Sequence, residues 1–188
     1  MAKTKSLTKI ISAKAEPARF SYAHVFEPKA INDGDEKYSV SILIDKTHKS
    51  TLSRIDKAIK AAIAEGEEKH GKKWSKGSNF KLPLRDGDEE RDEDEAYEGM
   101  YFLNANSKRK PQIVDAELNP ITDEDDFYSG CYGRFSVNFF PYNSNGNKGV
   151  GVGLNNIQKL KGGERLSGSS SAFDDFDDED EDDDDDLI

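Results

Sequence analysis

Cysteine and histidine are scarce in this sequence, and their scarcity excludes two common kinds of site. Cys131 is the single thiol, so the chain can form neither an internal disulfide nor a zinc site built from several thiolates. The histidines His24, His48 and His70 stand far apart and show no metal-ligand spacing. We therefore expect a cytoplasmic protein, from a reducing compartment, that needs no metal or other cofactor.

Long apolar runs are also missing. No stretch approaches the ~18 consecutive apolar residues of a membrane-spanning helix. Residues 1–5 are basic but are not followed by the apolar core of a secretion signal. With 34% hydrophobic and 35% charged residues in a chain of 188, the composition suits one soluble domain with an appendage.

Basic residues are absent from the last part of the chain. Residues 172–188 contain twelve Asp or Glu and no Lys or Arg, and without them 26 acidic residues face 27 basic ones. A second acidic block, residues 84–98, holds nine acidic residues and two arginines. The formal net charge of −11 therefore conceals a basic body, which is compatible with a polyanionic ligand. We expect a folded domain over 1–166, in which 84–98 is a mobile acidic loop, and a flexible Ser/Gly linker with a disordered acidic tail over 167–188.

Hydrophobic periodicity predicts a mainly β protein with one amphipathic α-helix. A period of two places Val40, Ile42 and Ile44 on one face of the clearest strand. Strands are predicted within residues 19–26, 38–44, 99–105, 131–142 and 149–154. Apolar residues at steps of three and four predict the helix from about residue 48 to Gly66 or Gly71. This order of elements favours an OB-fold-like barrel of five to seven strands.

Aromatic and basic residues interleave along the expected outer faces of these strands. Single-stranded nucleic acid is bound by this combination, because cations neutralise phosphates and each base stacked on a ring contributes about 1–3 kcal/mol. The expected nucleic-acid-binding residues are Arg19, Tyr22, Lys72, Lys73, Trp74, Tyr101, Lys108, Arg109, Lys110, Tyr132, Arg134, Phe140, Tyr142 and Lys148.

The last predicted strand has a bare face made of Gly149, Gly151 and Gly153. Bulky residues of the preceding strand, such as Tyr132, Phe140 and Tyr142, are expected to lie across this face. Two interpretations stay open: the glycines serve packing and bending, or they form a floor where a nucleobase approaches the backbone.

Catalytic motifs are lacking although acidic residues are abundant, because nearly all of these residues fall in aperiodic segments that would not hold their geometry. Asp86-Gly87-Asp88 resembles the start of a calcium-binding loop, but Arg91 stands where that loop requires glycine. We therefore expect no enzyme. Two alternatives to DNA binding are a nucleic-acid-mimicking or protein-interaction module, and a metal-dependent nuclease with acidic residues near Asp86 or Asp123.

A series of short motifs carries a resemblance that runs from about residue 15 to the C-terminus. The motifs are residues 18–22 (ARFSY), 102–105 (FLNA), 111–115 (PQIVD), 127–132 (FYSGCY), 139–142 (FFPY), 148–150 (KGV) and 162–164 (GGE). In this order the chain resembles phage-encoded single-stranded-DNA-binding proteins, an OB-fold family formerly classed as a domain of unknown function. The resemblance implies a sequence-independent, helix-destabilising protein that coats and protects unwound DNA in phage replication and recombination.

The resemblance also implies that the acidic tail moderates DNA binding and recruits phage or host replication and recombination proteins. The sequence ends on two apolar residues after the acidic run, whereas bacterial single-stranded-DNA-binding proteins usually end on Pro-Phe. The expected partner-binding residues of the tail are Phe173, Phe176, Asp186, Leu187 and Ile188. We expect the protein to be a monomer or a weak dimer.

Overall fold

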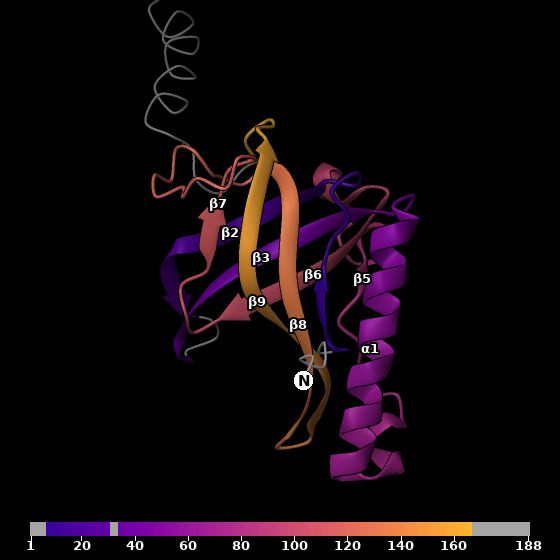
Figure 1. Ribbon diagram of the computed structural model, residues 1–188. Coiled ribbons are helices and arrows are strands. Elements are labelled where there is room, and N and C mark those ends of the chain that lie inside the picture. Colours follow the sequence, from indigo (N-terminus) through magenta and orange to yellow (C-terminus); the bar gives the residue numbers. More distant parts are fainter. Residues whose placement is uncertain (1–6, 31–33, 167–188) are drawn as a thin grey trace, which may run out of the picture.

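The computed structural model describes residues 7–30 and 34–166. A ring of five strands forms its centre (Figure 1). The ring strands are β2 (Ala18–Ala30), β3 (Glu36–Asp45), β6 (Met100–Ser107), β8 (Tyr132–Ser144) and β9 (Asn147–Lys161). Strand β2 pairs with β3, β3 with β6 and β6 with β9, and β8 closes the ring by pairing with both β9 and β2. This closed ring with one main helix confirms the predicted OB-fold-like class.

Alternation along the ring strands separates an inner from an outer face, as the period of two predicts. Val40, Ile42 and Ile44 of β3 lie in the main hydrophobic core, where they are 3%, 0% and 0% exposed. Phe135 and Val137 of β8 enter the same core from the other side of the ring. The residues between them therefore face outward.

Four short strands extend the ring. They are β1 (Lys9–Ile11) beside β8, β4 (Phe80–Lys81) and β7 (Gln112–Val114) beside β9, and β5 (Arg85–Asp86) beside β6. None of the helices among residues 7–30 and 34–166 is long and apolar enough to cross a membrane. Residues 167–188, for which we expect a linker and acidic tail, lie outside the described residues, and so do the tail residues expected to bind partners.

The predicted amphipathic helix is α1 (Lys49–His70), which lies along one side of the barrel (Figure 1). It buries Ile55, Ala58 and Ala62 against the core, chiefly beside β8. The helix continues through Gly66 and ends at Gly71, whose φ of +88° favours glycine.

Gly66 provides the space that Trp74 fills. A Cβ at Gly66 would lie 2.3 Å from the indole ring of Trp74, which belongs to η1 (Lys72–Ser75). The indole Nε1 donates a hydrogen bond of 3.0 Å to the Tyr142 carbonyl, and the ring meets Phe80 edge-on at 4.9 Å between centroids. Trp74 is only 4% exposed, so its prediction as a stacking platform is wrong: the indole is a core residue that joins α1 to β8.

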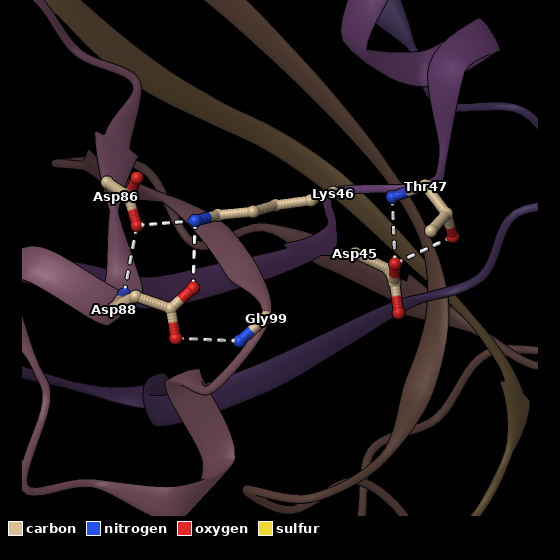
Figure 2. Close-up of polar contacts among 6 residues, drawn as sticks. All are labelled: Asp45, Lys46, Thr47, Asp86, Asp88 and Gly99. Carbon is tan, nitrogen blue, oxygen red and sulfur yellow. Dashed lines mark hydrogen bonds and ion pairs between the residues drawn. The ribbon is translucent and has the colours of Figure 1, made fainter.

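The acidic block, predicted as an aperiodic loop, instead contains β5, α2 (Gly87–Glu90) and η2 (Glu95–Tyr97). Two contacts explain why this segment is ordered. Tyr97 is 0% exposed, and Lys46, just after β3, holds both Asp86 and Asp88 at 2.8 Å (Figure 2). Charge composition alone therefore conceals an ordered segment with a buried aromatic residue.

Replacing Trp74 with alanine should lower the free energy of unfolding by about 3–5 kcal/mol, because it removes a buried indole and leaves a cavity. Urea unfolding followed by circular dichroism measures this loss. Leu82→Ala is the control, since Leu82 is 55% exposed, and it should change stability by less than about 0.5 kcal/mol. A loss below about 1 kcal/mol for Trp74→Ala would contradict this packing of the indole.

Candidate nucleic-acid interface

The outer face of the ring carries a ladder of cross-strand pairs between β3 and β6. The pairs are Leu43 with Phe102, Ser41 with Asn104, and Ser39 with Asn106. On the β2 side, Arg19, Ser21 and His24 pair with Leu43, Ser41 and Ser39. On the other side, Gly153 of β9 pairs with Asn106. Polar side chains thus run across β2, β3 and β6 at one end of this face, and a glycine of β9 adjoins them.

An open groove lies at this polar end. It has a volume of ≈ 440 Å³, within the ~300–1,000 Å³ range of ligand-binding clefts. Its polar and aromatic lining consists of Tyr22, His24, Ser39, Ser41, Arg91, Asn104 and Asn106. Hydroxyl and amide groups both donate and accept hydrogen bonds, so this lining can meet the edge of any nucleobase.

Tyr22 projects into solvent at the edge of the groove because of a bulge in β2. The pairing of β2 with β3 shifts register between Ser21 and His24, and Tyr22 adopts a φ of +48°, a conformation rare for an aromatic residue. Its side chain is 47% exposed, and its hydroxyl donates to Asp94 at 3.5 Å. A strained backbone that presents an aromatic ring to solvent is typical of a binding position.

His24 lies beside Tyr22 on the groove wall. Partial burial and the nearby charge of Lys29 lower the pKa of His24 below its ordinary value. The ring is therefore neutral at pH 7, with one donor and one acceptor nitrogen. No local motif marks His24 as a binding residue, because only the long-range pairing with Ser39 places it on this face.

A second, more basic groove continues from the end of β6. Its lining includes Ser107, Arg109, Lys110, Gln112, Asn155 and Asn156. Arg109 and Lys110 are exposed and take part in no ion pair within residues 7–30 and 34–166, whereas Lys108 pairs with Asp35 at 3.5 Å. The predicted residues Tyr22, Arg109 and Lys110 thus line two grooves on the β6 side of the barrel, while Lys72 and Lys73 are exposed on η1 beside the end of α1.

The glycine face of β9 is covered in part by Phe140, as predicted, whereas Tyr132 lies opposite Lys161, away from these glycines. Phe140 pairs with Gly151 and its ring lies over that residue, where a Cβ would come within 2.6 Å of the ring. A Cβ at Gly149 would instead meet the backbone of Lys81 at 2.3 Å, so that glycine serves strand packing. A Cβ at Gly153 would meet no atom closer than 3.6 Å, which is ordinary van der Waals contact. Packing therefore requires glycine at positions 149 and 151, whereas position 153, beside Asn106, has room for a Cβ.

Several other predicted contacts are engaged inside the protein. Tyr132 has the cations of Arg19 and Lys161 over its ring at 5.2 and 4.8 Å, and Lys46 stands 5.1 Å from the centroid of Tyr101. Arg134 donates from Nε to the Ser12 carbonyl at 3.1 Å. Tyr101, Tyr132 and Arg134 therefore make contacts within the barrel and do not line either of the two grooves.

The hairpin formed by β8 and β9 uses two more of the predicted residues. The Lys148 ammonium donates to the carbonyls of Lys76 and Lys73 at 2.7 and 3.4 Å, which fastens the hairpin to η1. Tyr142 is half-buried, and burial raises the pKa of its phenol. Both residues therefore position the hairpin, and Phe140, which is 40% exposed, is its accessible aromatic side chain.

Comparisons of the sequence with known proteins identify one family. The sequence model of the family described as "Enterobacter phage Enc34, ssDNA-binding protein" matches residues 8–188. Putative protein p50 of Acyrthosiphon pisum secondary endosymbiont phage 1 is 33% identical over 172 residues, which cover 86% of this chain and 92% of that protein.

Solved structures show the same fold. The single-stranded DNA-binding protein from bacteriophage Enc34 in complex with ssDNA matches with a TM-score of 0.73 and 21% identity, over 89% of this chain and 97% of that one. The single-stranded DNA-binding protein gp2.5 of bacteriophage T7 matches with a TM-score of 0.58 and 16% identity, over 91% and 99% of the two chains.

Proposed function

Because the chain belongs to the family of the ssDNA-binding protein of Enterobacter phage Enc34, we propose that it binds single-stranded DNA through the outer face of β2, β3, β6 and β9. The family consists of binding proteins rather than enzymes. We assign the binding surface chiefly because of the open polar groove with the exposed Tyr22 at its edge. In OB-fold barrels the face of the second and third barrel strands binds oligonucleotides, and here these strands are β3 and β6.

The proposed mechanism combines stacking with charge neutralisation. Tyr22 and Phe140 supply exposed ring faces for bases, and Arg109 and Lys110 supply charges for phosphates. Ser39 and the neighbouring amides offer donors and acceptors to base edges without selecting one base. Binding of this kind is tolerant of sequence, which suits a protein that coats and protects unwound DNA in phage replication and recombination in the host cytoplasm.

The acidic tail is proposed to compete with DNA and to recruit other replication or recombination proteins. Twelve acidic residues in 172–188 are tethered to residues 1–171, which carry a net charge of about +1, or about +8 when the acidic block is left out. A tethered polyanion acts at high effective concentration against a phosphate-binding surface. Phe173, Phe176 and the end Asp186-Leu187-Ile188 are the proposed partner contacts.

Replacing Tyr22 with asparagine should separate binding from folding. Asparagine tolerates a positive φ, so the free energy of unfolding should stay within about 1 kcal/mol of the wild type. Loss of one stacked base should weaken binding of a labelled oligo-dT by about 1–3 kcal/mol in fluorescence anisotropy. Tyr22→Phe keeps the ring and should bind like the wild type. Equal affinity of Tyr22→Asn and Tyr22→Phe would remove Tyr22 from the interface.

Replacing Arg109 and Lys110 together with glutamine should reduce the salt dependence of binding. Each neutralised phosphate contributes about 0.7 to the slope of log K against log salt concentration for single strands, so the slope should fall by about 1.4. The matched control is Lys57→Gln with Lys60→Gln, two exposed cations on α1. An equal change of slope in both double variants would indicate a net-charge effect rather than a local contact.

A variant that ends at Ser171 should bind oligo-dT more tightly than the full chain, because it lacks the twelve acidic residues of the tail. The gain should be largest at low salt and should shrink as salt screens the tail. Anisotropy titrations of both proteins at two salt concentrations measure this. Equal affinities at low salt would contradict the competitor role, and absence of binding by both proteins would favour an interaction module instead.

A further inference from the structure

The acidic block lies across the other end of the same outer face. Tyr97, Leu43 and Phe102 form a small buried cluster outside the barrel, separate from the main core. The Tyr97 hydroxyl donates to the Ser41 side chain at 2.8 Å, and its ring meets Phe102 edge-on at 5.1 Å between centroids. The block thus covers the outer-face pair Leu43–Phe102 and the hydroxyl of Ser41, whereas Asn104, opposite Ser41, stays exposed.

The open groove borders the block. Arg91 of the block forms part of the groove lining. Tyr22, on the opposite edge, contacts the block through its ring, 6.5 Å from that of Tyr97, and through its hydroxyl, 3.5 Å from Asp94. The part of the outer face that the block covers and the part that it leaves open therefore form one continuous surface of β3 and β6.

The block is held in this place by the burial of Tyr97, by the pairing of β5 with β6 and by a set of exposed polar contacts. Lys46 bridges Asp86 and Asp88 at 2.8 Å, and the second oxygen of Asp88 accepts from the Gly99 amide at 3.0 Å (Figure 2). The Lys46 ammonium holds the pKa of both carboxyl groups below the ordinary value, so both are charged at neutral pH. Contacts of this kind at the surface are weak individually and are screened by salt.

The charge of the block matches that of a nucleic-acid backbone. Nine acidic residues against two arginines lie within residues 84–98, and both arginines stand beside aromatic rings, although Arg85 stays exposed and pairs with Glu90 at 2.6 Å. Arg85 stands 5.3 Å from the centroid of Phe102, and Arg91 stands 5.8 Å from those of Phe102 and Tyr97. The block thus places an aromatic ring on the barrel face and carboxylates around it, as a bound strand would place a base and its phosphates.

We infer that the DNA-binding surface continues beneath the acidic block onto Ser41, Leu43 and Phe102, and that bound single-stranded DNA displaces the block. This inference rests on the proposed function. A strand in the open groove brings phosphates beside the carboxylates of the block, and displacement relieves that repulsion. It also frees the ring of Phe102 for a base. A ligand that binds only the uncovered face shifts the protein toward that state.

Lys46→Met tests the inference because it removes the ion pairs of Lys46 with Asp86 and Asp88, together with one positive charge. Loosening the block should tighten oligo-dT binding at low salt by about two- to fivefold, the range that an exposed ion-pair cluster contributes. Lys60→Met is the matched control: Lys60 pairs with Asp56 at 2.9 Å on the exposed face of α1, and its loss should leave affinity unchanged or slightly lower. Binding by Lys46→Met that is no tighter than that of Lys60→Met overturns the inference.

Hydrogen exchange of the wild-type protein gives a test that needs no variant. The Gly99 amide donates to the Asp88 carboxylate, and β5 of the block pairs with β6 at Arg85 and Asp86, so the backbone amides of these three residues report whether the block is in place. Saturating oligo-dT should accelerate their exchange, whereas slower or unchanged exchange would mean that DNA binds on or beside an intact block and would overturn the inference. That outcome leaves the proposed function standing, while failure of the wild type to bind oligo-dT contradicts both.

Discussion

The closure of the strand ring by the long antiparallel pairing of β8 with β9 is the constraint on which the rest of the structure depends. The pairing runs from Tyr132 opposite Lys161 to Ser144 opposite Asn147. Because side chains alternate along every strand, closure forces one set into the core and the other onto the surface. The outer ladder of β3 and β6, with Gly153 of β9 at its end, follows from that division rather than from any local motif.

What distinguishes the outer face is the contrast between its two ends. At one end, small polar residues, a neutral His24 and the strained Tyr22 leave an open groove. At the other end, Tyr97 and its acidic surroundings cover Leu43 and Phe102. The barrel thus combines a surface suited to bases with a segment of its own chain that has the charge of the expected ligand. Surface ion pairs help to hold that segment beside its buried Tyr97, so both salt and a bound polyanion are expected to weaken its attachment.

Much of the fold could be predicted from local pattern, because a period of two and a helical repeat record burial directly. The inner faces of β3 and β8 and the course of α1 agree with the sequence. The lysines beside Trp74 wrongly indicate a surface position, while the space that the indole fills is created by Gly66, eight positions earlier. The carboxylates around Tyr97 conceal its burial in the same way. His24 reaches the groove only through its pairing with Ser39, and the bulge at Tyr22 has no glycine or asparagine to indicate it.

Photochemical crosslinking of a bromodeoxyuridine-substituted oligonucleotide to the full chain, followed by peptide mapping, tests the central claim most directly. Crosslinks are expected on the outer face, at Tyr22 of β2 and in β6 and its basic continuation from Ser107 to Gln112. Crosslinks confined to the exposed side of α1 and to η1 would place the DNA on the other side of the barrel and would contradict binding through the outer face.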